Sequence, residues 1–211
     1  MTYLFPALFG CVSLVHLYTC LPPERQPLRS ITKCLLMPLL LAVYFVLRNP
    51  NSWLLSAALF FSFWGDLFLI MDNHRPAFLG GLGAFAVSHV LYCVHFLRLS
   101  SGTLLPAVVI PALFLYATLL DLLLRRILKR IPRSFALPCV CYMLLIASMN
   151  VLALNAAAVQ GTVRSWLDFL GAVLFCMSDF VLCINMFYKH RSWHSCFIMA
   201  MYIAAQVLIV L

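Results

Sequence analysis

The chain has very little charge, and acidic residues are the scarcest kind. Only 9% of its 211 residues are charged, and six acidic residues stand against fourteen Lys and Arg. A soluble domain carries charge on roughly a quarter of its residues, so a soluble globular protein is excluded. The 65% hydrophobic content and the mean hydropathy of +1.04 are typical of a chain that crosses a membrane several times.

Alternation of apolar and polar residues is also missing. A membrane β-barrel shows segments of about ten alternating residues, whereas this chain contains long, almost uniformly apolar runs of the kind that helices of ~20 residues need to span a bilayer. We therefore predict an all-α fold, a polytopic bundle of eight transmembrane helices that forms a single domain over residues 1–211. The predicted spans are Tyr3–Tyr18, Ile31–Leu47, Trp53–Met71, Phe78–Leu97, Leu104–Leu124, Phe135–Ala158, Trp166–Phe187 and Trp193–Leu211.

The nine cysteines show no C-x-x-C spacing and no cluster with histidine. Such spacings are what zinc sites and redox motifs require. Most of the cysteines lie inside the predicted spans, where cysteine behaves as a small apolar packing residue. We therefore expect neither a metal site nor a structural disulfide.

Basic residues concentrate in alternate connections between the predicted helices. By the positive-inside tendency, the odd-numbered connections face the cytoplasm and both termini lie on the opposite side. The net charge of +8 does not indicate nucleic acid, because the basic residues lie at helix ends without interleaved aromatics; anionic lipid headgroups are the expected partners. The odd connections and their helix ends hold eleven of the fourteen Lys and Arg: Arg25, Arg29, Lys33, Arg75, Arg125, Arg126, Lys129, Arg130, Arg133, Lys189 and Arg191.

Two of the few acidic residues lie well inside predicted spans. Asp66 and Asp179 precede the cytoplasmic ends of their helices by five and eight residues, which corresponds to depths of about 7 and 12 Å. A carboxylate in hydrocarbon is costly unless it is protonated, paired or lining a wet cavity, so both residues are candidates for a functional site. The plainer alternative is that each aspartate hydrogen-bonds a neighbouring helix.

Other polar side chains fall at a similar depth, so we expect five or six helices to line one polar chamber. Ser62 precedes Asp66 by one helical turn, and Tyr92 follows His89 by three residues. The further candidates are Lys33, Tyr142, Ser178, Asn185, which shares a helix face with Ser178, and Tyr202.

Each of these residues also has a structural interpretation. Lys33 can snorkel to the headgroups, and His89 can satisfy a hydrogen bond in the core. Core packing or helix contact is the alternative for Tyr142, Tyr202, Ser62 and Ser178, and we expect solvated roles for Asp72, Asp121 and Asp168, which lie near helix ends.

A shift of 113 residues aligns Asp66 with Asp179 and His89 with Tyr202. The two aspartates then occupy the third helix of two successive four-helix halves. Most other positions do not match, so the alignment indicates a parallel duplication only weakly.

Several motifs together resemble the YhhN-like lysoplasmalogenases, which are integral membrane proteins of eight helices. The resemblance spans nearly the whole chain and is weakest between Arg98 and Arg133. It implies hydrolysis of the vinyl ether bond of a 1-alkenyl-glycerophosphocholine or -ethanolamine to a fatty aldehyde and glycerophosphocholine or -ethanolamine. The motifs are Thr-Lys-Cys-Leu-Leu-Met-Pro at 32–38, Phe-Ser-Phe-Trp-Gly-Asp at 61–66, Ser-His-Val-Leu-Tyr at 88–92 and Gly-Ala-Val-Leu-Phe-Cys-Met-Ser-Asp at 171–179, followed by Asn185, Phe187, Tyr202 and Gln206.

Hydrolysis of a vinyl ether needs an acid, a nearby negative charge and a directed water. Protonation of the outer alkene carbon leaves an oxocarbenium ion, water adds to it, and the hemiacetal collapses. Two carboxyl groups in a poorly solvated chamber can divide these tasks, one protonated and the other ionised. We predict Asp66 and Asp179 as this pair, with either as the acid and with no metal or organic cofactor. His89 and Tyr142 complete the catalytic set, and the predicted substrate-binding residues are Lys33, Ser62, Tyr92, Ser178, Asn185, Tyr202 and Gln206.

Two other functional classes stay open at this stage: a proton-coupled transporter of a small amphiphile, and a lysolipid-binding protein without chemistry. Polar residues clustered in one half of the bilayer, with no discontinuous-helix pair, disfavour transport. The expected partners are the lysoplasmalogen and membrane lipids, and homodimerisation is left open. The expected location is a bacterial inner membrane or the eukaryotic endoplasmic reticulum.

Overall fold

The computed structural model describes residues 3–21, 26–48, 52–71, 75–127, 130–188 and 191–211, which form eight α-helices and no strand. Seven helices are long and apolar enough to cross a membrane, and the first is shorter. The prediction of an all-α, multi-pass membrane bundle is confirmed. The helices are α1 (Leu4–Thr19), α2 (Gln26–Leu47), α3 (Trp53–Ile70), α4 (Arg75–Leu99), α5 (Pro106–Ile127), α6 (Arg133–Gln160), α7 (Val163–Phe187) and α8 (Ser192–Val210).

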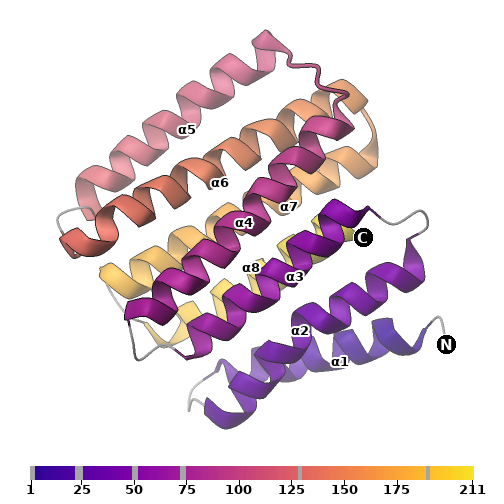
Figure 1. Cartoon of the computed structure of the whole chain (residues 1–211), viewed down its shortest axis with the longest axis vertical. Coiled ribbons are helices and arrows are strands. Elements are labelled where there is room, and N and C mark those ends of the chain that lie inside the picture. The colour runs from indigo at the N-terminus through magenta and orange to yellow at the C-terminus, as the bar shows by residue number, and fades with distance from the viewer. Residues whose placement is uncertain (1–2, 22–25, 49–51, 72–74, 128–129, 189–190) are drawn as a thin grey trace.

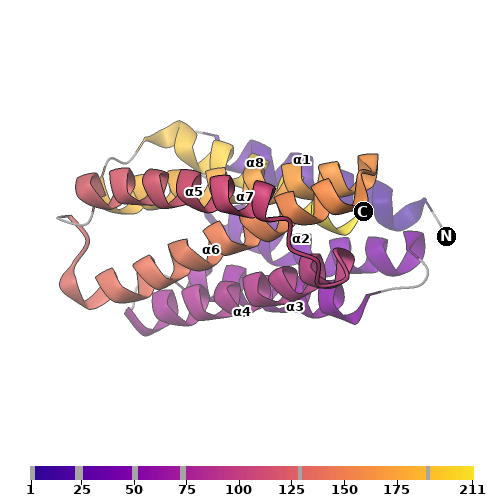
Figure 2. The ribbon, with the colours of Figure 1, turned by 90° about the horizontal axis from the view of Figure 1, so that it is seen from above.

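The helices run antiparallel to their neighbours in sequence, and both termini lie at the same end of the bundle (Figure 1). Helices α1 and α2 form one side of the bundle, α5 and α6 form the other, and α3, α4, α7 and α8 lie between them. Helix α4 also packs against α6. Helix α5 packs mainly against α6 and therefore lies at the edge of the bundle (Figure 2).

A two-residue turn fixes α6 against α7. Gly161 ends α6 with a φ of +62°, a left-handed conformation that glycine adopts without steric cost. Thr162 then caps α7, because its hydroxyl oxygen accepts a hydrogen bond from the backbone N–H of Ser165 at 3.2 Å. This turn keeps the two helices that carry Tyr142 and Asp179 side by side.

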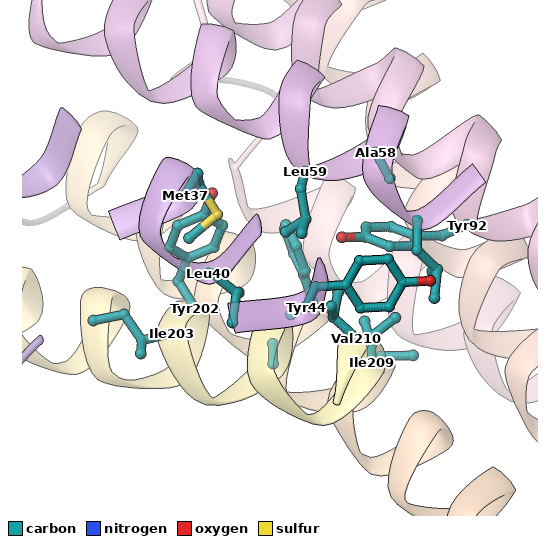
Figure 3. Close-up of a cluster of buried hydrophobic side chains, with 14 of the residues drawn as sticks. Met37, Leu40, Tyr44, Ala58, Leu59, Tyr92, Tyr202, Ile203, Ile209 and Val210 are labelled. Atoms are coloured by element: carbon teal, nitrogen blue, oxygen red, sulfur yellow. The ribbon is translucent and has the colours of Figure 1, made fainter. Parts of the chain in front are cut away.

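The largest apolar core lies where α2, α3, α4 and α8 meet (Figure 3). Leu40, Leu59 and Ile209 are fully buried there. Tyr92 and Tyr202 belong to the same core and bring hydroxyl groups into it. Because a buried hydroxyl needs a hydrogen-bond partner, the core has polar groups built into its packing.

A glycine lets α7 approach α8 closely. A Cβ atom at Gly171 would lie 2.8 Å from Cγ1 of Ile209 and 3.0 Å from the backbone oxygen of Ala205. The backbone of α8 thus occupies the space that a side chain would need. Small residues serve this purpose where membrane helices pack tightly.

We expect Gly171→Ala to lower the free energy of unfolding by about 1–3 kcal/mol, the usual cost of overpacking a core. Gly83→Ala is the matched control, since a Cβ at exposed Gly83 meets no atom within 4 Å; alanine there is expected to be neutral or to stabilise the helix by up to about 1 kcal/mol. Thermal unfolding in detergent measures both. Equal stability of the two variants would contradict the packing argument.

One contact between helices in the first half of the chain has a counterpart in the second half. Gly65 of α3 faces the ring of Phe85 of α4, and Ser178 of α7 donates a hydrogen bond to the backbone oxygen of Ile198 of α8 at 3.0 Å. Both members of the second pair are shifted by 113 residues from the first. The duplication stays a prediction, with which this one pair of equivalent contacts agrees.

The expectation that Asp168 has a solvated role is wrong. Asp168 is buried and forms a 2.5 Å ion pair with Arg164, one helical turn earlier on α7, instead of facing solvent. Helix α7 begins at Val163, three residues before the predicted span, so Arg164 is helical as well and Asp168 lies more than one turn from the helix start, where a buried carboxylate needs a partner. Asp121 is exposed, as expected, and pairs with Arg125 at 2.7 Å. Asp72 lies outside the described residues.

Candidate functional site

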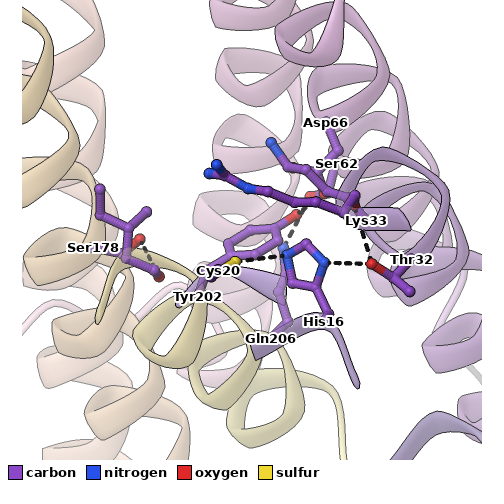
Figure 4. Close-up of polar contacts among 11 residues, drawn as sticks. His16, Cys20, Thr32, Lys33, Ser62, Asp66, Ser178, Tyr202 and Gln206 are labelled. Carbon is purple, nitrogen blue, oxygen red and sulfur yellow. Dashed lines mark hydrogen bonds and ion pairs between the residues drawn. The ribbon is translucent and has the colours of Figure 1, made fainter. Parts of the chain in front are cut away.

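Asp66 is buried near the end of α3, and both of its carboxylate oxygens have partners (Figure 4). The Nζ atom of Lys33 on α2 lies 3.2 Å from Oδ1. The hydroxyl of Tyr202 on α8 donates to Oδ2 at 2.9 Å. The side chain of Lys33 is only 17% exposed and points at this carboxylate, so it does not snorkel. Three helices therefore converge on one buried ion pair.

A hydrogen-bonded group continues deeper in the bundle from this ion pair. Gln206 donates through Nε2 to the hydroxyl of Ser62 at 3.0 Å, and its Oε1 accepts from Tyr92 at 2.5 Å. The hydroxyls of Ser62 and Ser88 are 2.8 Å apart, and Ser88 donates to the backbone oxygen of Ala58 at 2.9 Å. These bonds join α3, α4 and α8 across the apolar core.

A third polar group fixes the start of α2. The hydroxyl of Thr32 donates to the backbone oxygen of Leu28 at 2.8 Å, so it accepts the 2.8 Å hydrogen bond from Nδ1 of His16 on α1. The Sγ atom of Cys20 lies 3.7 Å from the other ring nitrogen of His16. Because Thr32 precedes Lys33, this contact holds the residue that pairs with Asp66 in place (Figure 4).

Asp179 has a different environment from Asp66. It lies eight residues before the end of α7, and Oδ2 accepts a 2.7 Å hydrogen bond from the hydroxyl of Tyr142 on α6. Within the described part of the chain it forms no ion pair. Its partner is thus a neutral phenol, whereas the partner of Asp66 is a cation.

His89 of α4 is fully buried beside Tyr142. Its Nδ1 donates to the backbone oxygen of Phe85 at 2.7 Å, and its ring lies edge-on to Tyr142 and Phe175, with centroid distances of 5.3 and 4.6 Å. Nε2 has no hydrogen-bond partner among the described residues. With the proton on Nδ1, Nε2 of the neutral ring offers a lone pair. A buried acceptor without a partner marks a place for a water molecule or a substrate atom.

A continuous series of aromatic rings lies between the two aspartates. Tyr202, which binds Asp66, lies edge-on to Phe175 at 5.4 Å; Phe175 packs on His89, and His89 packs on Tyr142, which binds Asp179. The expected single polar chamber is therefore two hydrogen-bonded sites joined by an aromatic layer.

An apolar cavity of about 470 Å³ adjoins Asp179 and lies between α4, α5, α6 and α7. Tyr116, Tyr142 and Asp179 bring polar atoms to a wall that is otherwise formed by apolar or sulfur-containing side chains, among them Leu82, Met143 and Phe180. Asp66 does not line this cavity. This cavity is the Asp179 groove.

Two of the predicted substrate-binding residues lie away from these sites. Ser178 bonds the backbone of Ile198, which is the helix-contact role considered for it. Asn185 accepts hydrogen bonds from Nδ1 of His194 at 2.9 Å and from the backbone N–H of Arg191 at 3.4 Å, at the turn from α7 to α8. Both residues tie α7 to α8.

Ser88 and Phe175 are among the residues of these sites that were not predicted from the sequence. Ser88 lies in the Ser-His-Val-Leu-Tyr motif beside His89, and its position in an apolar helix was the available signal. Phe175 gave no signal, because a phenylalanine in an apolar run is indistinguishable from an ordinary packing residue.

The fold and these sites define a multi-pass helical membrane protein with buried carboxyl groups beside an apolar groove. The chain belongs to the YhhN family, whose match covers residues 28–211. It is 32% identical to lysoplasmalogenase TMEM86B of Mus musculus over 216 residues, and it is similar to the Homo sapiens protein of the same name at 32% over 217 residues; each alignment covers 99% of this chain and 85% of the relative. Lysoplasmalogenase TMEM86A of Bos taurus is 30% identical over 177 residues, which is 79% of this chain and 68% of that protein. No solved structure gives a significant match.

Proposed function

We propose that the protein is a lysoplasmalogenase, which hydrolyses the vinyl ether bond of a 1-alkenyl-glycerophosphocholine or -ethanolamine to a fatty aldehyde and glycerophosphocholine or -ethanolamine. One observation carries this proposal: the carboxyl group of Asp179 lies in the wall of an apolar groove and is held there by Tyr142. The reaction needs an acid beside an alkenyl chain, and this arrangement supplies both. The named relatives support the substrate class.

The unequal partners of the two aspartates support unequal roles. Asp66 faces the ammonium group of Lys33, which favours the ionised carboxylate. Asp179 faces a phenol and an apolar wall, where a neutral carboxylic acid avoids the cost of an unpaired buried charge. We assign Asp179 as the general acid and Asp66 as the fixed negative charge.

In the first step, Asp179 gives its proton to the outer alkene carbon of the substrate. The electrons of the double bond form the new C–H bond, and the positive charge is shared by the inner carbon and the ether oxygen. Asp179 is then a carboxylate beside a cation, and the hydroxyl of Tyr142 stabilises that carboxylate by donating to Oδ2. Asp66 adds negative potential from the other side of the aromatic layer.

In the second step, water adds to the cationic carbon. Nε2 of His89 is positioned to accept a hydrogen bond from this water, because it is buried, unpartnered within the described structure and adjacent to Tyr142. The proton released by the water returns to Asp179, which restores the acid. The hemiacetal hydroxyl then loses its proton and its oxygen becomes the aldehyde carbonyl, while the bond from the same carbon to the glycerol oxygen breaks. The glycerol oxygen takes up one proton in exchange, so the aldehyde and the glycerol product leave with no net gain or loss of protons.

Replacement of His89 by phenylalanine is expected to lower kcat for aldehyde release by about 10²-fold, the low end of general acid–base effects, with a smaller change in KM. Phenylalanine keeps the edge-on contacts with Tyr142 and Phe175 but removes the acceptor nitrogen. His95→Phe, on the same helix, is the matched control and is expected to change kcat little. Wild-type kcat in His89→Phe would remove His89 from the mechanism.

Release of aldehyde from a 1-alkenyl lysophospholipid by detergent-purified protein tests the function itself. Saturable lysolipid binding without aldehyde would favour a binding protein, and substrate-dependent proton flux without product would favour a transporter.

In the proposed orientation, the odd-numbered connections are cytoplasmic and the substrate enters from that leaflet. The protomer carries the whole proposed site, whether or not it forms a homodimer.

A further inference from the structure

The Asp179 groove combines an apolar wall with one acidic side chain. Asp179 is the single carboxyl group among its lining residues, and no Lys, Arg or His lines it within the described part of the chain. The other lining side chains that carry oxygen are two phenols. The hydroxyl of Tyr142 donates to Oδ2 of Asp179 at 2.7 Å, and the hydroxyl of Tyr116 donates to Oδ1 of Asn150 at 3.0 Å. The ligand that complements this surface in charge and polarity is one cation on an apolar body.

The carboxyl group of Asp179 has room for a second partner. The side chain is only half-buried, and within the described residues its Oδ1 accepts no hydrogen bond and its carboxyl group forms no ion pair. By contrast, Lys33 and Tyr202 occupy both carboxylate oxygens of Asp66. Each oxygen of a carboxylate can accept hydrogen bonds, so a donor in the groove can bind Oδ1 without displacing Tyr142.

The groove extends further to one side of Asp179 than to the other. Along α7 its lining continues from Asp179 to Phe187, about 12 Å of helix, but only to Cys176 on the other side, about 5 Å. The longer arm is apolar and contains Cys183, one turn from Asp179, and Met186. The volume of about 470 Å³ lies within the range of small-molecule sites. A compact apolar body with its cation at one end fits this shape.

The groove is open to the bilayer between α5 and α7. Leu119 and Leu122 of α5 and Met177 and Phe180 of α7 line it, and each is also exposed on the surface of the bundle by 44% or more of its area. These side chains face the groove on one side and hydrocarbon on the other, because α5 packs mainly against α6. A lipophilic molecule can therefore enter from the membrane without passing through water.

We propose that the Asp179 groove is a binding site for lipophilic amines, molecules that join a basic nitrogen to an apolar body. The amine dissolves in the bilayer in its neutral form and enters between α5 and α7. Its nitrogen takes the proton of Asp179: the O–H bond breaks, an N–H bond forms, and an ammonium–carboxylate pair results without a proton entering or leaving the groove. Tyr142 stabilises the carboxylate through Oδ2, and the apolar body lies along the arm toward Phe187.

A bound amine resembles the cationic state of the proposed reaction. Protonation of the alkene leaves a cation beside the carboxylate of Asp179, and the ammonium group places its charge at the same carboxylate. Since a stable mimic of a high-energy state binds more tightly than the substrate, lipophilic amines are expected to inhibit aldehyde release. This inhibition rests on the proposed function, whereas the binding rests on the groove itself.

The first test measures binding and does not depend on turnover. A decylamine with a diazirine on its chain is irradiated with the protein in lipid nanodiscs, and labelled peptides are identified by mass spectrometry. Labels are expected in 119–123, 139–143 and 179–187. Decylamine is expected to compete them away at a mole fraction in the bilayer about 10–100-fold lower than 1-decanol, the scale of one hydrogen bond to a charged group. Decanol has the same chain length and no basic nitrogen.

Two variants of matched thermal stability separate the charge of the site from its shape. Asp179→Asn keeps a carbonyl oxygen for Tyr142 but has no proton to give, so it is expected to remove the preference for decylamine over decanol. Cys183→Phe places a ring in the longer arm and is expected to reduce labelling about tenfold or more, since apolar pockets discriminate by that factor over one methylene group. Cys141→Phe is its matched control, because Cys141 is exposed on α6 and does not line the groove.

The second test is inhibition of aldehyde release, for which decylamine is expected to be about 10–100-fold more potent than decanol. Labelling that is selective for the amine and requires Asp179 supports the site even if the wild type releases no aldehyde, an outcome that would defeat only the proposed function. Aldehyde release by the wild type, with equal competition by decylamine and decanol or with selectivity that survives Asp179→Asn, would overturn the amine site while the proposed function stands.

Discussion

Asp179→Asn is expected to abolish detectable aldehyde release, with a fall of at least 10²–10⁴-fold, the range of general acid–base catalysis. Asparagine has nearly the size of aspartate and keeps a carbonyl oxygen for the hydroxyl of Tyr142, so the contact between α6 and α7 survives. It has no acidic proton to give to the alkene carbon. The measurement is aldehyde formation from a 1-alkenyl lysophospholipid by purified protein of matched thermal stability.

Asp121→Asn is the matched control for this experiment, because Asp121 is exposed on α5 and pairs with its neighbour Arg125. It is expected to keep wild-type turnover. Asp66→Asn is also expected to lose turnover, since it removes the fixed negative charge. Near-normal turnover in both Asp179→Asn and Asp66→Asn would rule out the carboxylate pair.

Lys33→Met is expected to have the largest effect on stability. It leaves the carboxylate of Asp66 buried without its cation, while Tyr202 still donates to it. Removal of one partner of a buried ion pair typically costs about 3–5 kcal/mol, because the remaining charge is uncompensated. Thermal unfolding in detergent is expected to show a large decrease in Tm.

The double variant Lys33→Met/Asp66→Asn is expected to recover most of this loss, because no unpaired charge stays buried; the two changes would then be strongly non-additive. Arg125→Met is the control, since its partner Asp121 and its own side chain are exposed, and such surface pairs contribute about 0–1 kcal/mol. A Lys33→Met protein as stable as wild type would show that the ion pair does not hold α2 and α3 together.

The sequence predicted the helices well, because run length and hydropathy measure what a bilayer requires. Its errors of three or more residues at helix ends share one cause: hydropathy detects the part of a helix in hydrocarbon, while the hydrogen-bonded helix extends beyond it into polar residues. Helix α2 therefore begins at Gln26 and not at Ile31, and α7 begins at Val163 and not at Trp166. The second difference explains the error about Asp168, whose partner Arg164 was placed outside the helix.

The sequence predicted many of the residues of the candidate site but not which of them contact one another. An aspartate in an apolar run is conspicuous, and depth along each helix placed Asp66 and Asp179 in the same layer. Which tyrosine meets which aspartate depends on how the helices rotate and pack, and neighbouring sequence does not encode that. The Asp179 groove could not be predicted from the sequence, because the residues that line a cavity in a membrane protein and those that face lipid are both apolar.

The Asp179 groove opens toward the bilayer, so the concentration of lipid in the membrane, and not in water, governs its occupancy. Leu119, Leu122, Met177 and Phe180 meet hydrocarbon, so a lipid chain encounters the groove by diffusion in two dimensions. If the groove binds lysolipid in the proposed reaction, its occupancy follows the mole fraction of lysolipid in the surrounding leaflet and not the amount per volume of water. The protein is thereby suited to respond to the composition of its own membrane, since inert lipid added to that leaflet lowers occupancy even when the total lysolipid is unchanged.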